Sequence, residues 1–364
     1  MKRIGLWSLV CLLALVGCSP STDGGGRSGE AEEGEKTPSA EADLEVVADS
    51  LDIPWSVVET DDSLLVSERE GAIVEVPKNG QDPVRKGVKL QHEVLHQGEG
   101  GFLGLEPAPD FEESRAVFAY HTYRSDGEIY NRVVRLEEAD DAWEESDVLI
   151  EKIPGAGIHN GGRIKIGPDE KLYITTGDAN IEEIAQDREN LGGKILRMEL
   201  DGSIPTDNPI SDSLVYSYGH RNPQGLAWDE GGQLYSSEHG PTAHDEINRI
   251  EPGKNYGWPE IVGDEEKEGM ETPLYHSGTD TWAPSGLAYA AQKLWVAGLR
   301  GQQMRSFSPD GEQTELKLEG EGRLRDIIPA SDGSFYILTN NTDGRGTPQD
   351  ADDRLLNWPG SKGK

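Results

Sequence analysis

Two Gly-rich stretches of this 364-residue chain carry a histidine and a carboxylate that together could do acid–base chemistry. His159 lies in GIHNGG, where the glycines leave the imidazole little steric cover, and Asp178 lies in TTGDA. A neutral His whose ring is oriented by a carboxylate is the usual construction of a general base near neutral pH. A lone His is more often structural, so this interpretation requires a fold that brings His159 and Asp178 together.

Four arginines stand out in a chain that is short of cations, namely Arg221, Arg300, Arg323 and Arg325. Acidic residues outnumber basic ones 68 to 34, and the formal net charge is -34. Because a guanidinium group binds a carboxylate through two parallel hydrogen bonds, the four arginines predict a ligand that carries several carboxylates. The alternative is that each Arg pairs with a neighbouring acid such as Asp326.

A loop-rich stretch, 218–259, combines oxygen donors with Gly-Pro turns and contains no thiol. Hard oxygen ligands, including the carbonyls of a Gly-Pro turn within Glu238–Pro241 and the acids Asp245 and Glu246, suit calcium better than zinc or copper. His239 and His244 raise the alternative of a transition metal, but they are five residues apart and lack a third partner of suitable spacing.

The elements that must position these residues are short apolar runs separated by turns, with almost no helical periodicity from Leu44 onward. Three series of runs each have six members in the same order. The first series starts at Pro54, Gly101, Gly162, Gln224, Ser285 and Leu324; the second at Leu64, Val117, Leu172, Leu234, Leu294 and Phe335; the third at Ala72, Arg132, Lys194, Glu246, Gln303 and Asp353. A repeat of roughly 50 residues is near the range for propeller blades.

A six-bladed β-propeller of four-stranded antiparallel blades is therefore the predicted fold, and the class is all-β. Outer fourth strands are expected from Asp147, Leu214 and Leu316. The last blade lacks one before the chain ends, so we expect LEVVADS, from Leu44, to complete it and close the ring. Two β-sandwich domains are the weaker alternative.

This topology assigns polar residues to one face of the disc. The start of each first strand and the loop after each second strand lie on the same face. The residues expected to converge there are Glu99, His159, Asp178, Arg221, Asn222, His239, Gly240, Pro241, Asp245, Arg300, Arg323, Arg325 and Asn340. This face is the predicted ligand site.

The N-terminus has the features of an exported lipoprotein. Basic residues precede an apolar run, Ile4–Val16, that ends in the lipobox-like sequence Leu-Val-Gly-Cys at Cys18. We therefore expect a lipoprotein signal peptide over 1–18, with an ordinary signal peptide cleaved elsewhere as the alternative. Residues 19–43 are predicted to be a flexible acidic linker, and residues 44–364 the propeller domain. Because Cys11 and Cys18 are the only cysteines, no disulfide can stabilise the domain.

The charge excludes whole classes of partner. A net charge of -34 repels nucleic acid and anionic lipid, so membrane contact is expected only through the lipid anchor at the outer face of a membrane. An exported protein this acidic also predicts a halophile or alkaliphile host.

Six runs of the sequence resemble the soluble quinoprotein aldose and glucose dehydrogenases. They are GEGGFLGLEPAPDF, HNGGRIKIGPDEKLYITTGD, LGGKILRMELDGSIPTDNP, YSYGHRNPQGLAW, SEHGPTAHDEINRIEPGKNYGWP and RLRD. The resemblance extends from about Pro54 to Leu338. It implies a six-bladed propeller that uses pyrroloquinoline quinone (PQQ) and calcium to oxidise aldose sugars at C1 to lactones. Electrons would pass to an external acceptor, a quinone or a cytochrome.

The resemblance also implies roles for individual residues. His159 would be the general base for the anomeric hydroxyl, and Asp178 would orient it. Arg221 would polarise the quinone carbonyl, with Asn222 beside it. The other expected cofactor-binding residues are Glu99, Arg300, Arg323 and Arg325.

Calcium would be bound by the carbonyls of Gly240 and Pro241. A second calcium site is expected near Asp245, Glu246 and the Tyr256 carbonyl.

Three departures from the glucose-specific members favour the broad-specificity aldose branch. Ile158 replaces an Asp, Glu99 replaces a Gln, and Arg300 replaces a Lys.

Two other functions are compatible with a propeller of this kind. One is a calcium-dependent lactonase or esterase that would use His159 with a metal-bound water, although a hydrolase of neutral lactones has no use for four arginines. The other is a non-catalytic sugar-binding propeller. The joint presence of His159, Asp178 and Arg221 argues against that alternative.

Overall fold

The computed structural model describes residues 44–311 and 314–359. All of these residues belong to one compact unit. The predicted signal peptide with Cys18 and the predicted linker lie outside the described residues. Within the described ranges, no helix is long and apolar enough to cross a membrane.

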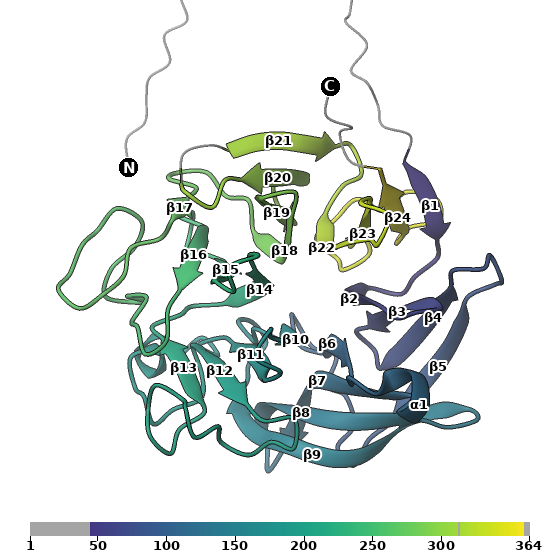
Figure 1. Cartoon of the computed structure of the whole chain (residues 1–364), viewed down its shortest axis with the longest axis horizontal. Coiled ribbons are helices and arrows are strands. Elements are labelled where there is room, and N and C mark those ends of the chain that lie inside the picture. Colours follow the sequence, from purple (N-terminus) through teal and green to yellow (C-terminus); the bar gives the residue numbers. More distant parts are fainter. Residues whose placement is uncertain (1–43, 312–313, 360–364) are drawn as a thin grey trace, which may run out of the picture. The chain divides into compact units, whose positions relative to one another are not determined.

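The strands form six four-stranded blades in a ring, which confirms the predicted propeller (Figure 1). Blade 1 comprises β2 (Pro54–Glu59), β3 (Ser63–Glu68), β4 (Ala72–Pro77) and β5 (Val84–Lys89). Blade 2 comprises β6 (Phe102–Pro107), β7 (Ala116–Ser125), β8 (Glu128–Glu138) and β9 (Ala142–Pro154). Blade 3 comprises β10 (Ile164–Ile166), β11 (Leu172–Thr176), β12 (Lys194–Met198) and β13 (Val215–Tyr218). Blade 4 comprises β14 (Pro223–Trp228), β15 (Leu234–Glu238), β16 (Glu246–Ile250) and β17 (Tyr275–His276). Blade 5 comprises β18 (Pro284–Ala290), β19 (Lys293–Gly298), β20 (Gln303–Phe307) and β21 (Thr314–Glu319). Blade 6 comprises β22 (Leu324–Pro329), β23 (Phe335–Thr339), β24 (Leu355–Trp358) and β1 (Glu45–Ala48). The short helices are α1 (Phe111–Ser114) and the 3₁₀ helix η1 (Glu182–Ala185).

The ring closes as predicted, because the first strand of the domain pairs with the last. β1 is antiparallel to β24, with Glu45 opposite Asn357 and Val46 opposite Leu356. The final blade therefore contains strands from both ends of the domain, so neither end can separate without breaking a sheet.

One feature of the sheets was not anticipated. β5 and β9 pair in parallel, which joins blades 1 and 2 at their outer edges into an eight-stranded sheet. The outer strands β5 and β17 were not predicted individually. β5 reads VRKGVK and is largely exposed, and β17 has two residues, so neither carries an apolar pattern.

The hydrophobic core lies between adjacent blades. Leu103 of blade 2 packs in one cluster with Ile164 and Leu172 of blade 3, and Ala227 of blade 4 packs in another with Leu287 of blade 5. All five side chains are buried. Since every blade is covered on both faces by its neighbours, inner strands such as β3 and β15 are buried at every residue rather than at alternate residues.

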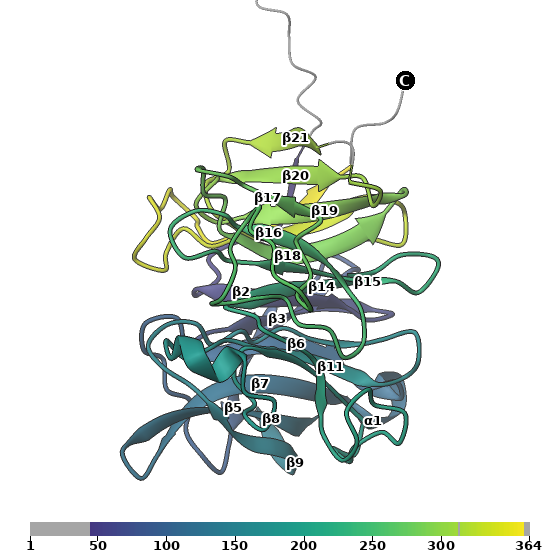
Figure 2. The same ribbon diagram turned by 90° about the vertical axis from the view of Figure 1, so that its left-hand side faces the viewer.

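The two faces of the disc differ as the topology requires. First strands begin where second strands end, as shown by the pairs Pro54–Glu68 and Pro223–Glu238. In the edge view of Figure 2, the yellow loop between β23 and β24 projects from one face, and α1 lies on the other. We call the face with the β23–β24 loop the site face.

Candidate active site

His159 and Asp178 meet on the site face, as predicted. The His159 Nδ1 lies 2.7 Å from the Asp178 Oδ1, and both residues are buried. The other carboxylate oxygen of Asp178 accepts a hydrogen bond of 2.9 Å from the Trp258 indole. With Nδ1–H donated to Asp178, a neutral His159 has its lone pair on Nε2, which has no hydrogen-bond partner among the described residues. The pair has the form of a positioned general base.

The backbone of His159 is held in an unusual conformation. Its φ of 57° lies in the left-handed region, which is uncommon for a residue with a Cβ. Two contacts hold it there: the His159 N–H donates to Glu99 Oε2 at 3.0 Å, and the His159 carbonyl accepts from Ala179 N at 3.2 Å. Gly177 must be a glycine because a Cβ there would clash with that carbonyl.

Arg221 and Asn222 are held by one buried carboxylate. Glu238 Oε1 accepts hydrogen bonds from the backbone N–H groups of both residues, and its Oε2 lies 2.9 Å from His220 Nδ1. The Arg221 guanidinium lies 5.3 Å from the centre of the Trp258 ring, which also contacts Asp178. Burial lowers the pKa of Arg221. The buried Arg221 Nε and Asn222 Nδ2 have no partner within the described ranges, so both donors are available to a ligand.

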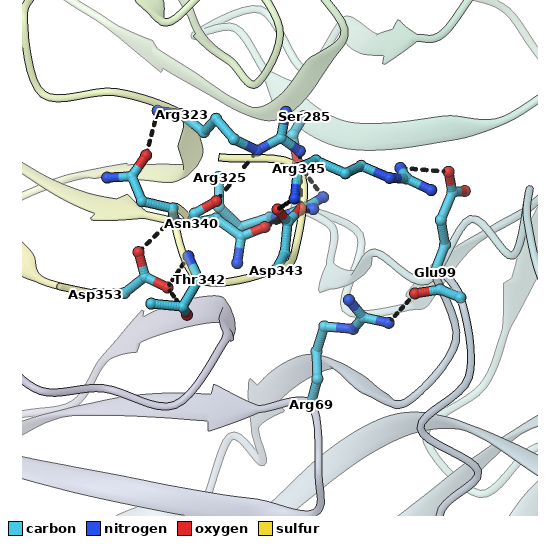
Figure 3. Close-up of polar contacts among 12 residues, drawn as sticks. Arg69, Glu99, Ser285, Arg323, Arg325, Asn340, Thr342, Asp343, Arg345 and Asp353 are labelled. Carbon is cyan, nitrogen blue, oxygen red and sulfur yellow. Dashed lines mark hydrogen bonds and ion pairs between the residues drawn. The ribbon is translucent and has the colours of Figure 1, made fainter. Parts of the chain in front are cut away.

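Arg323 and Arg325 are both buried on the site face but have different partners (Figure 3). Arg323 forms an ion pair of 2.8 Å with Asp343. Arg325 instead donates to Asn340 Oδ1, Gln224 Oε1 and Ser285 Oγ, and no ion pair between described residues includes it.

Burial, together with the neighbouring Arg323, lowers the pKa of Arg325 to about 9. A buried cation without a carboxylate partner favours an anionic ligand. Asp326, the acid considered as an alternative partner, is bound by Arg163 at 2.8 Å.

Arg300 differs from the other predicted arginines because its side chain is exposed. Its backbone N–H donates to Trp282 at 3.1 Å, and the preceding residue, Leu299, lines the hollow described below. No ion pair of Arg300 occurs within the described part of the chain.

The predicted metal residues fall into two groups. The carbonyl oxygens of Gly240 and Pro241 accept no hydrogen bond from described residues. Asp245 is committed to the fold, because its carboxylate accepts from Gly240 N at 3.0 Å and from the backbone N–H groups of Trp282 and Ala283 at 2.5 and 2.8 Å.

The expected second calcium site contains Glu246 and Tyr256. Burial raises the pKa of Glu246 to about 8, and Glu238 contributes. The Tyr256 carbonyl accepts no backbone hydrogen bond among described residues. Within the described ranges, no group of three or more His, Cys, Asp or Glu side chains could hold a metal. A calcium ion on this face would therefore depend on carbonyl oxygens and on the ligand.

A hollow at the centre of the site face brings predicted and unpredicted residues together. Its lining includes Trp55, Arg69, Glu99, His239, Arg325 and Arg345. Burial lowers the pKa of His239 to about 4, so this imidazole is neutral at physiological pH.

Three charged residues of this region were missed from the sequence: Arg69, Asp343 and Arg345. All three follow second strands, β3 or β23, so the rule that selected the other site residues would have selected them too.

The chain is similar to sugar dehydrogenases over most of its length. The family model described as "Glucose / Sorbosone dehydrogenase" matches residues 51–348. The PQQ-bound aldose sugar dehydrogenase of Streptomyces coelicolor is 41% identical, with a TM-score of 0.81 over 86% of this chain and 97% of that one. The aldose sugar dehydrogenase YliI of Escherichia coli K12 is 31% identical over 84% of this chain and 92% of its own. Quinoprotein glucose dehydrogenase B of Acinetobacter calcoaceticus is 33% identical over 67% and 58%.

Proposed function

Because the chain belongs to the glucose/sorbosone dehydrogenase family, we propose that it uses PQQ and calcium to oxidise aldose sugars at C1 to lactones. Electrons then pass to an external acceptor, a quinone or a cytochrome. One observation carries the proposal: the His159–Asp178 pair lies on the same face as the buried Arg325, which lacks a carboxylate partner among the described residues. A base beside an anion site is what a quinoprotein with a carboxylated cofactor requires.

The residues present fit a multiply carboxylated quinone. Arg325 supplies a cation that forms no ion pair in the described part of the chain, and Arg323 supplies a second cation, paired with Asp343. Arg221 Nε and Asn222 Nδ2 are buried donors with no partner among the described residues. Such donors are costly to bury unless a ligand satisfies them. Arg300 and Glu99 complete the proposed cofactor-binding set.

His159 is the proposed base for the anomeric hydroxyl. The free Nε2 accepts the hydroxyl proton, and Asp178 stabilises the imidazolium that forms. Arg221 is placed to stabilise negative charge that develops on a bound carbonyl oxygen. PQQ, when bound, supplies the two-electron oxidant for the C1 hydride. Trp258 contacts both Asp178 and Arg221, since its indole donates to Asp178 and its ring lies under the Arg221 guanidinium.

We propose that calcium binds through the carbonyls of Gly240 and Pro241 together with cofactor oxygens. The role of Asp245 is to hold this loop, because its carboxylate oxygens are already used by backbone N–H groups. A second calcium near Glu246 and the Tyr256 carbonyl remains part of the proposal. Hard oxygen donors without a thiol support calcium over zinc.

The sequence also supports an exported, lipid-anchored enzyme. Cys18 would carry the lipid, and 19–43 would tether the propeller outside the membrane. An exported acceptor could then reach the site face. A Cys18→Ala variant is therefore expected to lose its attachment to the membrane.

Reduction of a dye by an aldose tests the proposed function. Purified apo-protein supplied with PQQ and calcium is expected to reduce the dye with at least one sugar from an aldose panel. Omission of PQQ, or removal of calcium by a chelator, should abolish the reaction, and restoring calcium should recover it. No dye reduction with any aldose at saturating cofactor, tested also at high salt, would contradict the proposal. Lactone hydrolysis by the PQQ-free protein would favour the lactonase alternative.

A further inference from the structure

Arg69 binds both backbone carbonyls that flank Glu99. Its Nη2 donates to the Gly98 oxygen at 2.5 Å and to the Gly100 oxygen at 2.6 Å. Arg69 is 4% exposed and follows β3 of blade 1, whereas the Gly98–Gly100 segment precedes β6 of blade 2. In Figure 3 the Arg69 side chain points from the blade 1 ribbon toward the Glu99 backbone. Arg69 therefore links two blades at the residue that contacts the proposed base.

The segment that Arg69 binds is packed too closely to move freely. Gly98 has a φ of 63°, and a Cβ there would clash with the Gly157 carbonyl. The Glu99 N–H donates to that same carbonyl at 2.8 Å. Gly157 lies two residues before His159, so the Gly98–Gly100 segment and the His159 loop are joined backbone to backbone.

The Glu99 side chain makes the second connection between these loops. Its Oε2 accepts the His159 N–H at 3.0 Å, and its Oε1 forms an ion pair of 2.8 Å with Arg345. These contacts lower the pKa of Glu99 to about 2 despite its burial, so the carboxylate stays ionised at neutral pH. An ionised acceptor gives a stronger hydrogen bond to the His159 amide than a neutral one.

The position of the His159 imidazole depends on how firmly its backbone amide is held. A residue with a Cβ in the left-handed region is strained unless its surroundings stabilise it. Loss of the Glu99 contact would therefore allow the His159 backbone to relax and the imidazole to move. A displacement of about 1 Å at a reacting group can cost on the order of 100-fold in rate.

We propose that Arg69 is a positioning residue: by binding the carbonyls on both sides of Glu99, it holds the Glu99 carboxylate against the His159 amide and so fixes the position of the base. This inference rests on the proposed function only for its effect on turnover. The contact chain from Arg69 through Glu99 to His159 exists in the protein without cofactor.

Two measurements on Arg69→Gln test the proposal. The first is hydrogen–deuterium exchange at the His159 amide of the apo-protein, which we expect to be at least about 10-fold faster than in the wild type, because a carbonyl clamp is lost. The second is steady-state kinetics of the loaded enzyme with C1-protiated and C1-deuterated sugar. We expect kcat to fall about 10- to 100-fold with KM within about twofold, and the isotope effect to increase as the chemical step becomes limiting.

Three further variants separate positioning from charge and from folding. Arg249→Gln removes an exposed cation away from the hollow and leaves the contacts of Arg69 and Glu99 intact, so His159 exchange should stay within about threefold of wild type. Arg69→Lys keeps the charge but lacks the planar guanidinium, so its His159 exchange rate should lie between those of the wild type and Arg69→Gln. If Arg69→Gln does not fold, Arg69→Lys takes its place in both measurements. In a double-mutant cycle with Glu99→Ala, the Arg69→Gln loss should nearly vanish, because both changes break one chain of contacts.

The results that overturn the proposal are equally specific. His159 exchange at the wild-type rate in both Arg69 variants would show that Arg69 does not hold the amide. Additive losses of kcat in the cycle would show that Arg69 acts independently of Glu99. If the wild type oxidises no aldose, the exchange experiment still decides the positioning claim, while the proposed function fails on its own.

Discussion

Replacing His159 with Gln is expected to lower kcat by about 100- to 10,000-fold, the range over which a general base contributes to catalysis. Gln keeps much of the volume of the imidazole and its hydrogen-bonding capacity toward Asp178, but it cannot accept a proton. The PQQ dissociation constant, from absorption titration of the apo-protein with calcium present, should stay within a few-fold of wild type. The variant would then lose turnover but still bind PQQ.

A half-buried histidine of blade 4 provides the control for this experiment. His276 lies 2.9 Å from Asp264 and opposite Glu246, so it repeats the His–carboxylate pairing away from His159. His276→Gln should leave kcat near the wild-type value. A His159→Gln enzyme with kcat within about tenfold of wild type would remove His159 from the role of base.

Replacing Arg325 with Gln is expected to weaken PQQ binding by about 30- to 1,000-fold, because truncating one member of a buried, hydrogen-bonded charge pair costs at least about 2 kcal/mol. Arg325 is buried and forms no ion pair with a carboxylate among the described residues, since Asp343 is paired with Arg323. A carboxylate of the ligand would therefore contribute both charge and hydrogen bonds. The loss should appear in the dissociation constant, with kcat at saturating PQQ reduced much less.

The control for Arg325 is an arginine on the surface. Arg249 is exposed and donates to Gln233 at 3.1 Å, so Arg249→Gln removes the same charge away from the hollow. The two variants have the same net charge, so any difference between them reports position. Equal PQQ dissociation constants for Arg325→Gln and the wild type would contradict an anion site at Arg325.

The fold was largely predictable because the inner three strands of each blade are buried. Burial on both faces makes them short, continuous apolar runs, and six such runs in register identify the blades. β1 could be assigned to the last blade because the ring must close. β5 and β17 could not be identified in this way, since one is exposed and charged and the other has two residues. The parallel pairing of β5 with β9 depends on how two blades lean together, which no local pattern encodes.

The site was predictable where topology alone decides position. His159 precedes the first strand of blade 3 and Asp178 follows its second strand, so their meeting follows from strand order. Side-chain partners could not be predicted in this way, because they depend on distances across the ring. Arg163 binds Asp326, and Arg345 reaches Glu99 from a loop 246 residues away. Arg69 was missed because the series of site residues was not extended to blade 1, although it obeys the same rule.

Anaerobic mixing of the loaded enzyme with an aldose tests the central claim most directly. The protein, saturated with PQQ and calcium and kept free of any acceptor, should show conversion of the cofactor spectrum from the oxidised to the reduced form, with one lactone formed per cofactor. His159→Gln should carry out the same conversion far more slowly. An unchanged spectrum with every aldose tested, in a protein shown by titration to bind PQQ, would contradict the account.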